Sequence, residues 1–61
     1  MKYTYAIYFT WNDGTKDSFN VKDAEDRNMN IKDMIARKEF SSISYRRIYS
    51  NGEYGKRINV M

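Results

Sequence analysis

The sequence predicts a small α+β domain of ββαββ topology, in which a four-stranded, mainly antiparallel sheet carries one helix on one face. Three patterns indicate this fold: alternating apolar and polar residues near the N-terminus, two glycine-containing turn signals, and a helical spacing of apolar residues between them. They place a hairpin at 2–21, a helix at about 29–38 and a second hairpin at 42–60. At 61 residues the chain is expected to form a single domain, 1–61.

The first hairpin is the clearest element. From Lys2 to Trp11, aromatic and other apolar residues alternate with smaller or polar ones, a pattern typical of a β-strand. Residues 12–15 follow as a turn, for which two registers compete. A two-residue loop would point Phe19 away from Ile7, whereas a type I turn with Gly14 in the left-handed conformation gathers the apolar side chains on one face. We therefore expect the pairs Trp11–Thr15, Ile7–Phe19 and Tyr5–Val21.

The second hairpin is predicted from Asn51-Gly52, a strong signal for a two-residue turn. This turn sets Arg46 directly across from Arg57, so two like charges would face each other. It also sets Arg47 across from Lys56 on the opposite face. The full set of expected pairs is Ser50–Glu53, Tyr49–Tyr54, Arg47–Lys56, Arg46–Arg57, Tyr45–Ile58 and Ile43–Val60.

The helix is predicted from the spacing of Ala24, Ile31, Met34 and Ile35. Asn28 or Asn30 is expected to cap its main segment, and residues 23–28 are expected to form a separate turn or an irregular first helical turn.

The preferred strand order is 2-1-3-4, because it makes every pair of neighbouring strands antiparallel and the crossover right-handed. One helix then covers one face of the sheet. The side chains expected in this core are Tyr5, Ile7, Phe9, Phe19, Val21, Ile31, Met34, Ile35, Ile43, Tyr45, Ile58 and Val60.

Composition argues against catalysis and metal binding. The chain has no His and no Cys, which removes the commonest general base, the thiol nucleophile and the preferred zinc ligands. An acidic group, Asp23, Glu25, Asp26 and Asp33, lacks the ligand order of a calcium loop. We therefore expect no enzymatic activity, no cofactor and no metal.

Charge and aromatic residues indicate where a partner could bind. The net charge is +3, and residues 40–61 carry the whole excess. Antiparallel sheets often leave one face in solvent, and here that face is polar and basic. The candidate binding residues are Tyr8, Lys16, Arg46, Ile48 and Arg57 on this face, Arg47 and Lys56 on the other face near the turn, and Tyr49 and Tyr54 at the hairpin end.

These residues favour a binding module for a protein partner, because Tyr and Arg are preferred anchors of protein interfaces. A nucleic-acid-binding module is the alternative, since Tyr8 could stack a base and the cations could contact phosphates. Tight nonspecific DNA binding uses about 6 to 10 phosphate contacts, more than this patch offers. A homodimer that covers the open face or pairs an edge strand is the second alternative.

The amino-acid composition indicates the kind of genome that encodes the chain. The chain has no Leu or Gln, while Ile, Asn, Lys and Tyr each occur six times, as A/T-rich coding produces. We expect a phage or mobile-element protein that modulates a host factor. No apolar stretch approaches the roughly 20 residues of a membrane-spanning helix, so we expect no membrane partner and a cytoplasmic location.

Overall fold

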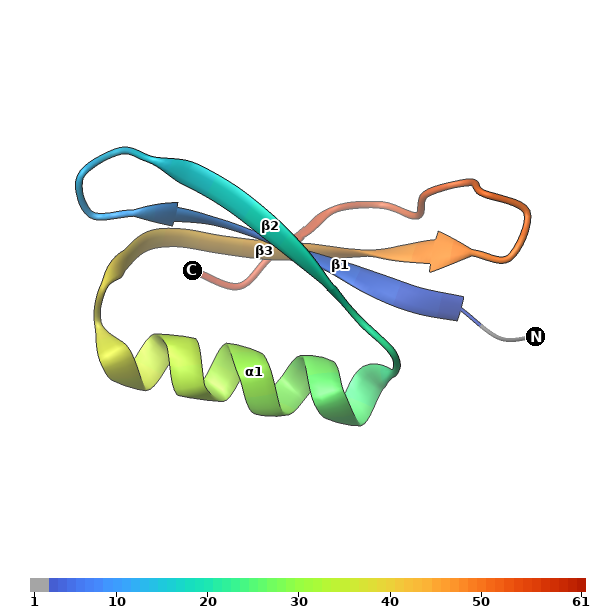
Figure 1. Ribbon diagram of the computed structural model, residues 1–61, viewed down its shortest axis with the longest axis horizontal. Coiled ribbons are helices and arrows are strands. Elements are labelled where there is room, and N and C mark those ends of the chain that lie inside the picture. The colour runs from blue at the N-terminus through green and yellow to red at the C-terminus, as the bar shows by residue number, and fades with distance from the viewer. Residues whose placement is uncertain (1–2) are drawn as a thin grey trace.

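The computed structural model describes residues 3–61, and it confirms the predicted ββαββ fold (Figure 1). Lys2, the expected start of the first strand, lies outside the described residues. The strand order is β2-β1-β3-β4, as predicted, with every neighbouring pair antiparallel. The elements are β1 (Tyr3–Trp11), β2 (Lys16–Val21), α1 (Ala24–Arg37), β3 (Phe40–Tyr49) and β4 (Ile58–Asn59).

The register of the first hairpin is confirmed. Ile7 pairs with Phe19 and Tyr5 with Val21. At the turn, the Trp11 N–H donates to the Thr15 carbonyl at 2.7 Å, and Gly14 adopts a φ of 94°, which glycine tolerates without strain. The Asp13 carboxylate accepts a hydrogen bond from the Thr15 N–H at 2.9 Å, and this bond is the main cause that lowers the pKa of Asp13.

The helix begins earlier than predicted, so the prediction that Asn28 or Asn30 caps it is wrong. Asp23 is the N-cap, and its carboxylate accepts a hydrogen bond from the Asp26 N–H at 2.8 Å. A capping carboxylate and two further acidic residues in the first turn stabilise the positive end of the helix dipole. These local interactions outweigh the weak helix propensity of the two asparagines, and residues 24–28 form regular helix.

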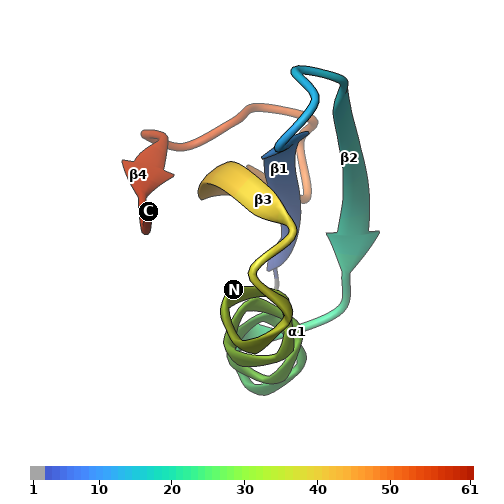
Figure 2. The same ribbon diagram turned by 90° about the vertical axis from the view of Figure 1, so that its left-hand side faces the viewer.

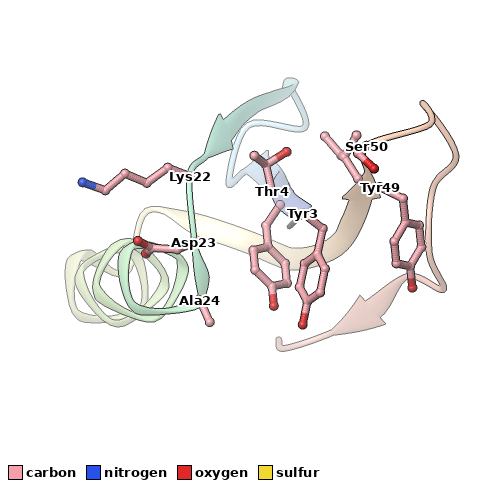
Figure 3. Close-up of a pocket in the computed structure, with 9 residues that line it drawn as sticks. Tyr3, Thr4, Lys22, Asp23, Ala24, Tyr49 and Ser50 are labelled. Atoms are coloured by element: carbon pink, nitrogen blue, oxygen red, sulfur yellow. The ribbon is translucent and has the colours of Figure 1, made fainter. Parts of the chain in front are cut away.

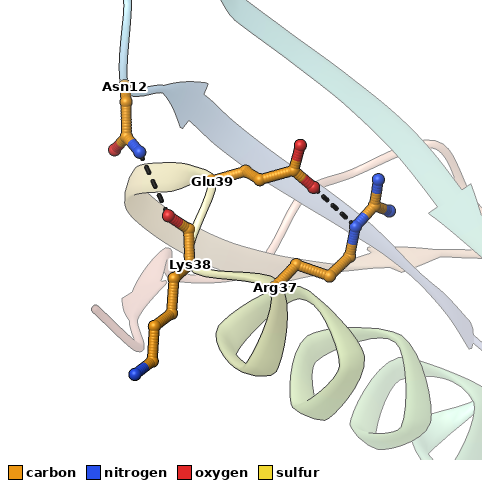
Figure 4. Close-up of polar contacts among 4 residues, drawn as sticks. All are labelled: Asn12, Arg37, Lys38 and Glu39. Atoms are coloured by element: carbon orange, nitrogen blue, oxygen red, sulfur yellow. Dashed lines mark hydrogen bonds and ion pairs between the residues drawn. The ribbon is translucent and has the colours of Figure 1, made fainter.

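The C-terminal end of α1 is tied to the first hairpin turn. Lys38 adopts the left-handed conformation, with φ 57° and ψ 30°, and turns the chain toward β3. The Asn12 side-chain amide donates to the Lys38 carbonyl at 3.1 Å, and Arg37 pairs with Glu39 at 2.7 Å (Figure 4). The turn between β1 and β2 is thereby joined to the C-terminal end of the helix.

The core lies between α1 and the two central strands, β1 and β3 (Figure 2). Phe40, which the sequence did not place in the core, is buried and packs against Trp11 with ring centroids 4.6 Å apart. The buried cluster consists of Tyr5, Ile7, Val21, Ile31, Met34, Phe40 and Ile43, with Phe9, Phe19 and Tyr45 partly buried against it.

The prediction of a core position is wrong for three residues, which are exposed. Ile35, Ile58 and Val60 are 41%, 49% and 37% exposed. The helix turns Ile31 and Met34 inward, which leaves Ile35 at the margin, and β4 lies to the side of the helix rather than over it (Figure 2). One 14-residue helix covers only the centre of the sheet. No helix within residues 3–61 is long and apolar enough to cross a membrane.

The turn of the second hairpin differs from the prediction. The Tyr49 N–H donates to the Glu53 carbonyl at 2.8 Å, and Gly52 has a φ of 88°. The turn thus repeats the arrangement of the first hairpin instead of a two-residue loop at Asn51-Gly52. The expected pairs Ser50–Glu53 and Tyr49–Tyr54 are wrong, and Tyr54 instead bridges Ile48.

Further from the turn the predicted register returns, because Tyr45 pairs with Ile58. The Gly55 N–H donates to the Arg47 carbonyl at 2.8 Å, so the expected Arg47–Lys56 pair is also wrong. Between these two points β3 contributes one residue, Arg46, and the returning chain contributes both Lys56 and Arg57. This extra residue interrupts the ladder and leaves β4 short.

The left-handed conformation of Lys38 predicts a stabilising substitution. Lys38→Gly removes the steric cost of a side chain at positive φ and should raise the free energy of unfolding by about 0.5 to 1 kcal/mol. Thermal unfolding followed by circular dichroism should then show a midpoint roughly 3 to 8 °C higher. The control, Lys32→Gly on the exposed helix surface, should lower the stability by about 1 kcal/mol. A Lys38→Gly midpoint at or below that of the wild type would contradict this account.

Candidate functional site

Arginine side chains lie against tyrosine rings on both faces of the sheet. Within residues 3–61 the only ion pair is Arg37–Glu39, so these arginines are held by aromatic rings and hydrogen bonds rather than by carboxylates. The stacked pairs are Arg27 on Tyr5 and Tyr45, Arg47 on Tyr3, Arg46 on Tyr8 and Tyr54, and Arg57 on Tyr8.

On the face away from the helix, Tyr8, Arg46, Tyr54 and Arg57 form one group, the Tyr8 cluster. The Arg46 Nε donates to the Tyr8 hydroxyl at 2.7 Å, and its guanidinium carbon lies 4.1 Å from the Tyr54 ring centroid. The guanidinium carbon of Arg57 lies 4.0 Å from the centroid of the Tyr8 ring. Four of the residues singled out in the sequence are therefore brought together.

The Tyr8 cluster forms because of the irregular second hairpin. Arg57 stands just before β4 and opposite Arg46, as the pairing of Tyr45 with Ile58 requires, but the regular ladder ends before these two residues. Both guanidinium groups approach the Tyr8 side chain. The electron-rich ring offsets part of the repulsion between the two cations. Most of the N–H donors of the two guanidinium groups remain available to a ligand.

Lys16 extends this surface. A hollow of about 280 Å³ lies beside Tyr8, and Lys16, Asp17, Arg57 and Asn59 are among the residues that line it. Lys16 is exposed at the start of the edge strand β2. The basic open face, as used below, consists of the Tyr8 cluster together with Lys16.

Ile48 lies on the same face, where it bridges Tyr54 of the Tyr8 cluster. It is partly buried and lines a larger hollow, of about 710 Å³, at the other end of the sheet (Figure 3). The Asp23 carboxylate in the wall of this hollow already caps the helix. The hollow adjoins Tyr3, the first described residue, and we assign no ligand to it. Its lining is Tyr3, Thr4, Tyr5, Lys22, Asp23, Ala24, Ile48, Tyr49 and Ser50.

Arg47, Lys56 and Tyr49 lie on the other face of the sheet. They line a cleft of about 230 Å³ next to the helix, the helix-side cleft, together with Arg27, Tyr45 and Ile58. Side-chain hydrogen bonding to Tyr49, and then to Tyr5, raises the pKa of Arg47 above its ordinary value. Tyr49 and Tyr54 are thus on opposite faces and do not form the expected pair.

Arg27 is the functional candidate that sequence reasoning missed. Its guanidinium carbon lies 4.4 Å from the Tyr45 ring centroid and 4.6 Å from that of Tyr5. Arg27, Ile31 and Met34 have the spacing of one helix face. This spacing places Arg27 on the inner face only if the helix begins at Ala24, as it does in the structure.

Comparison of the chain with protein-family models, with curated proteins and with solved structures found no match.

The hydrogen bond between Arg46 and Tyr8 predicts a measurable coupling. Tyr8→Phe keeps the ring but removes the acceptor, and it should lower the free energy of unfolding by about 1 kcal/mol. A double-mutant cycle with Arg46→Gln, followed by urea denaturation, should give a coupling energy of about 0.5 to 1.5 kcal/mol.

Arg57 supplies the matched control for this cycle, because it stacks on the Tyr8 ring and the ring remains in Tyr8→Phe. The coupling of Tyr8→Phe with Arg57→Gln should therefore be clearly smaller than that with Arg46→Gln. Equal couplings for both arginines would argue against a specific bond to the hydroxyl.

Proposed function

We propose that this protein is a non-catalytic binding module that recognises an acidic surface of a partner protein through its basic open face. The observation that carries the proposal is the Tyr8 cluster, where two arginines are held on a single tyrosine with no carboxylate pairing either guanidinium within residues 3–61. Guanidinium groups bind carboxylates in two-pronged geometry, and arginine and tyrosine are frequent hot spots of interfaces.

Pre-positioning supports this use of the cluster. Arg46 is partly buried, and it is held both by its bond to the Tyr8 hydroxyl and by the Tyr54 ring. A side chain that is already ordered loses less conformational entropy when it binds. Lys16 and Arg57 are exposed beside it and would add attraction to an acidic surface at the edge of the contact.

The stacking also weighs against the nucleic-acid alternative. Arg57 lies over the Tyr8 ring at 4.0 Å, so a base that stacks on this ring has to displace Arg57 from it. Recognition of carboxylates uses the guanidinium groups where they are. The geometry thus favours an acidic protein over a single strand that stacks its bases.

A homodimer is the remaining alternative for this chain. The exposed apolar side chains of Tyr54, Ile58, Val60 and Met61 lie along the C-terminal part of the chain. Contact between copies through these residues would cover Tyr54, on which Arg46 stacks, so a dimer of this kind would compete with an acidic partner for the open face. Light scattering across a dilution series separates this alternative, because a dimer should dissociate toward 7.3 kDa.

The proposal is tested by affinity capture from a lysate of a low-GC bacterium, the kind of source that the residue bias indicates. Wild type, the double variant Arg46→Gln/Arg57→Gln and the control Lys32→Gln are compared side by side. The control removes one exposed positive charge from the helix, away from the open face. A partner should be retained by wild type and control and lost with the double variant, because the variant removes both guanidinium groups.

Binding of the purified partner and of a short oligothymidylate is then measured over a range of salt concentrations. The proposal requires that the partner binds through an acidic segment and that the oligonucleotide does not compete. A partner that binds the double variant as tightly as the wild type would refute the role of the open face. Tight binding of the oligonucleotide with a steep salt dependence would support the nucleic-acid alternative instead.

A further inference from the structure

The helix-side cleft gathers positive charge on the face opposite the Tyr8 cluster. Its lining contains three cationic side chains, Arg27, Arg47 and Lys56, and no carboxylate among the described residues. We propose that this cleft binds a phosphate monoester. The proposal goes beyond the recognition of an acidic partner and does not depend on it, because the two surfaces share no side chain.

Arg27 is the most firmly positioned cation of the cleft. The side-chain oxygen of Asn28 accepts hydrogen bonds from the Arg27 Nε at 3.1 Å and from the Arg27 Nη2 at 2.9 Å. The guanidinium carbon also lies over the rings of Tyr45 and Tyr5. A guanidinium has five N–H donors, so three remain for a ligand. An arginine fixed in this way offers phosphate oxygens a planar donor set at a low entropic cost.

Gly55 has no side chain to crowd the cleft opposite Arg27. A Cβ at this position would lie 3.3 Å from the Cβ of Arg47 and 3.4 Å from the hydroxyl of Tyr49. Any larger residue would therefore crowd two of the side chains that line the cleft. The Gly55 N–H donates to the Arg47 carbonyl at 2.8 Å, which also fixes the backbone where Lys56 leaves the hairpin.

The size and charge of the cleft fit a phosphoryl group. Its volume of about 230 Å³ is below the roughly 300 to 1,000 Å³ of whole-ligand pockets, so the rest of a ligand would lie outside. Ile58, 49% exposed, provides an apolar rim for that part. A phosphate monoester carries about −1.5 to −2 charge at neutral pH, which balances three cations better than a single carboxylate does.

The test is a titration of the full chain with phenyl phosphate at low ionic strength, followed by two-dimensional NMR. Shifts should concentrate on the Arg27 Nε–H and on the Gly55 amide. Lys56→Gln is the main variant, because Lys56 is exposed and outside the regular elements, so the fold should persist. It should weaken binding roughly three- to tenfold, and Arg27→Gln should do the same.

Lys32→Gln is the matched control, because it removes an equal charge from the exposed helix surface, outside both the cleft and the open face, and should leave the affinity for phenyl phosphate unchanged. Equal weakening by Lys32→Gln and Lys56→Gln would show only general attraction to a basic chain and would overturn the proposal. Absence of saturable shifts at the cleft would also overturn it. Neither result bears on the acidic partner, whose binding depends on Arg46 and Arg57.

The pH dependence of phenyl phosphate affinity is a second test, because a purely structural effect of these residues would not follow the ionisation of the phosphate. The groups lining the cleft are Arg27 from α1, Tyr45, Arg47 and Tyr49 from β3, and Lys56 and Ile58 from the returning chain. The chain has no histidine to titrate near neutrality. Binding of phenyl phosphate should therefore strengthen about fourfold from pH 5.5 to 7, as the dianion forms.

Sulfate, which is a dianion throughout this pH range, should bind without such a change, and a rise for sulfate equal to that for phenyl phosphate would contradict the proposal. Adenosine monophosphate, titrated in parallel, distinguishes the source of the phosphate. Tighter binding of phenyl phosphate points to a phosphorylated tyrosine side chain, and tighter binding of the nucleotide points to a nucleotide. Either outcome supports a site for a phosphate monoester.

Discussion

Stacking of arginine on tyrosine is the interaction on which most of this structure depends. The buried core is small, and the single helix covers only the centre of the sheet. Guanidinium groups lie over the rings of Tyr5, Tyr8 and Tyr45. Long cationic side chains that lie on aromatic surface bury their apolar stems and keep their charge in solvent. In this chain the same contacts complete the apolar packing and hold the cations in fixed places on the surface.

The parts of the fold that the sequence predicted are those where local and nonlocal preferences agree. Along β1 the alternation, the left-handed Gly14 and the pairing of Ile7 with Phe19 all require one register. The second hairpin lacks this agreement. Its turn favours a three-residue loop ending in Gly52, whereas the apolar pattern favours Tyr45 opposite Ile58, and these two registers differ by one residue. The chain satisfies both by inserting a residue between them, which simple pairing from either end does not predict.

The candidate site shows the same division. Alternation along the strands was enough to put Tyr8 and Arg46 on one face, and the basic hairpin was visible in the charge distribution. Arg57 was placed on the correct face, but its contact with the Tyr8 ring depends on the interrupted ladder. The helix-side cleft could not be foreseen, because it needs Arg27 on a regular helical turn, whereas the low helix propensity of Asn28 and Asn30 indicated a separate or irregular turn over residues 23–28. The Asp23 side chain stabilises that turn by accepting a hydrogen bond from the Asp26 N–H.

The central claim is that tyrosine rings hold the arginines of the surface in place, and ring-current shifts of Arg57 test it most directly. Protons above an aromatic ring are shielded, and the Arg57 guanidinium carbon lies 4.0 Å from the Tyr8 ring centroid. The side-chain δ and ε proton resonances of Arg57 should therefore lie upfield of their positions in urea-unfolded protein, and they should return toward those positions in folded Tyr8→Leu. Identical Arg57 shifts in folded wild type and folded Tyr8→Leu would contradict the account.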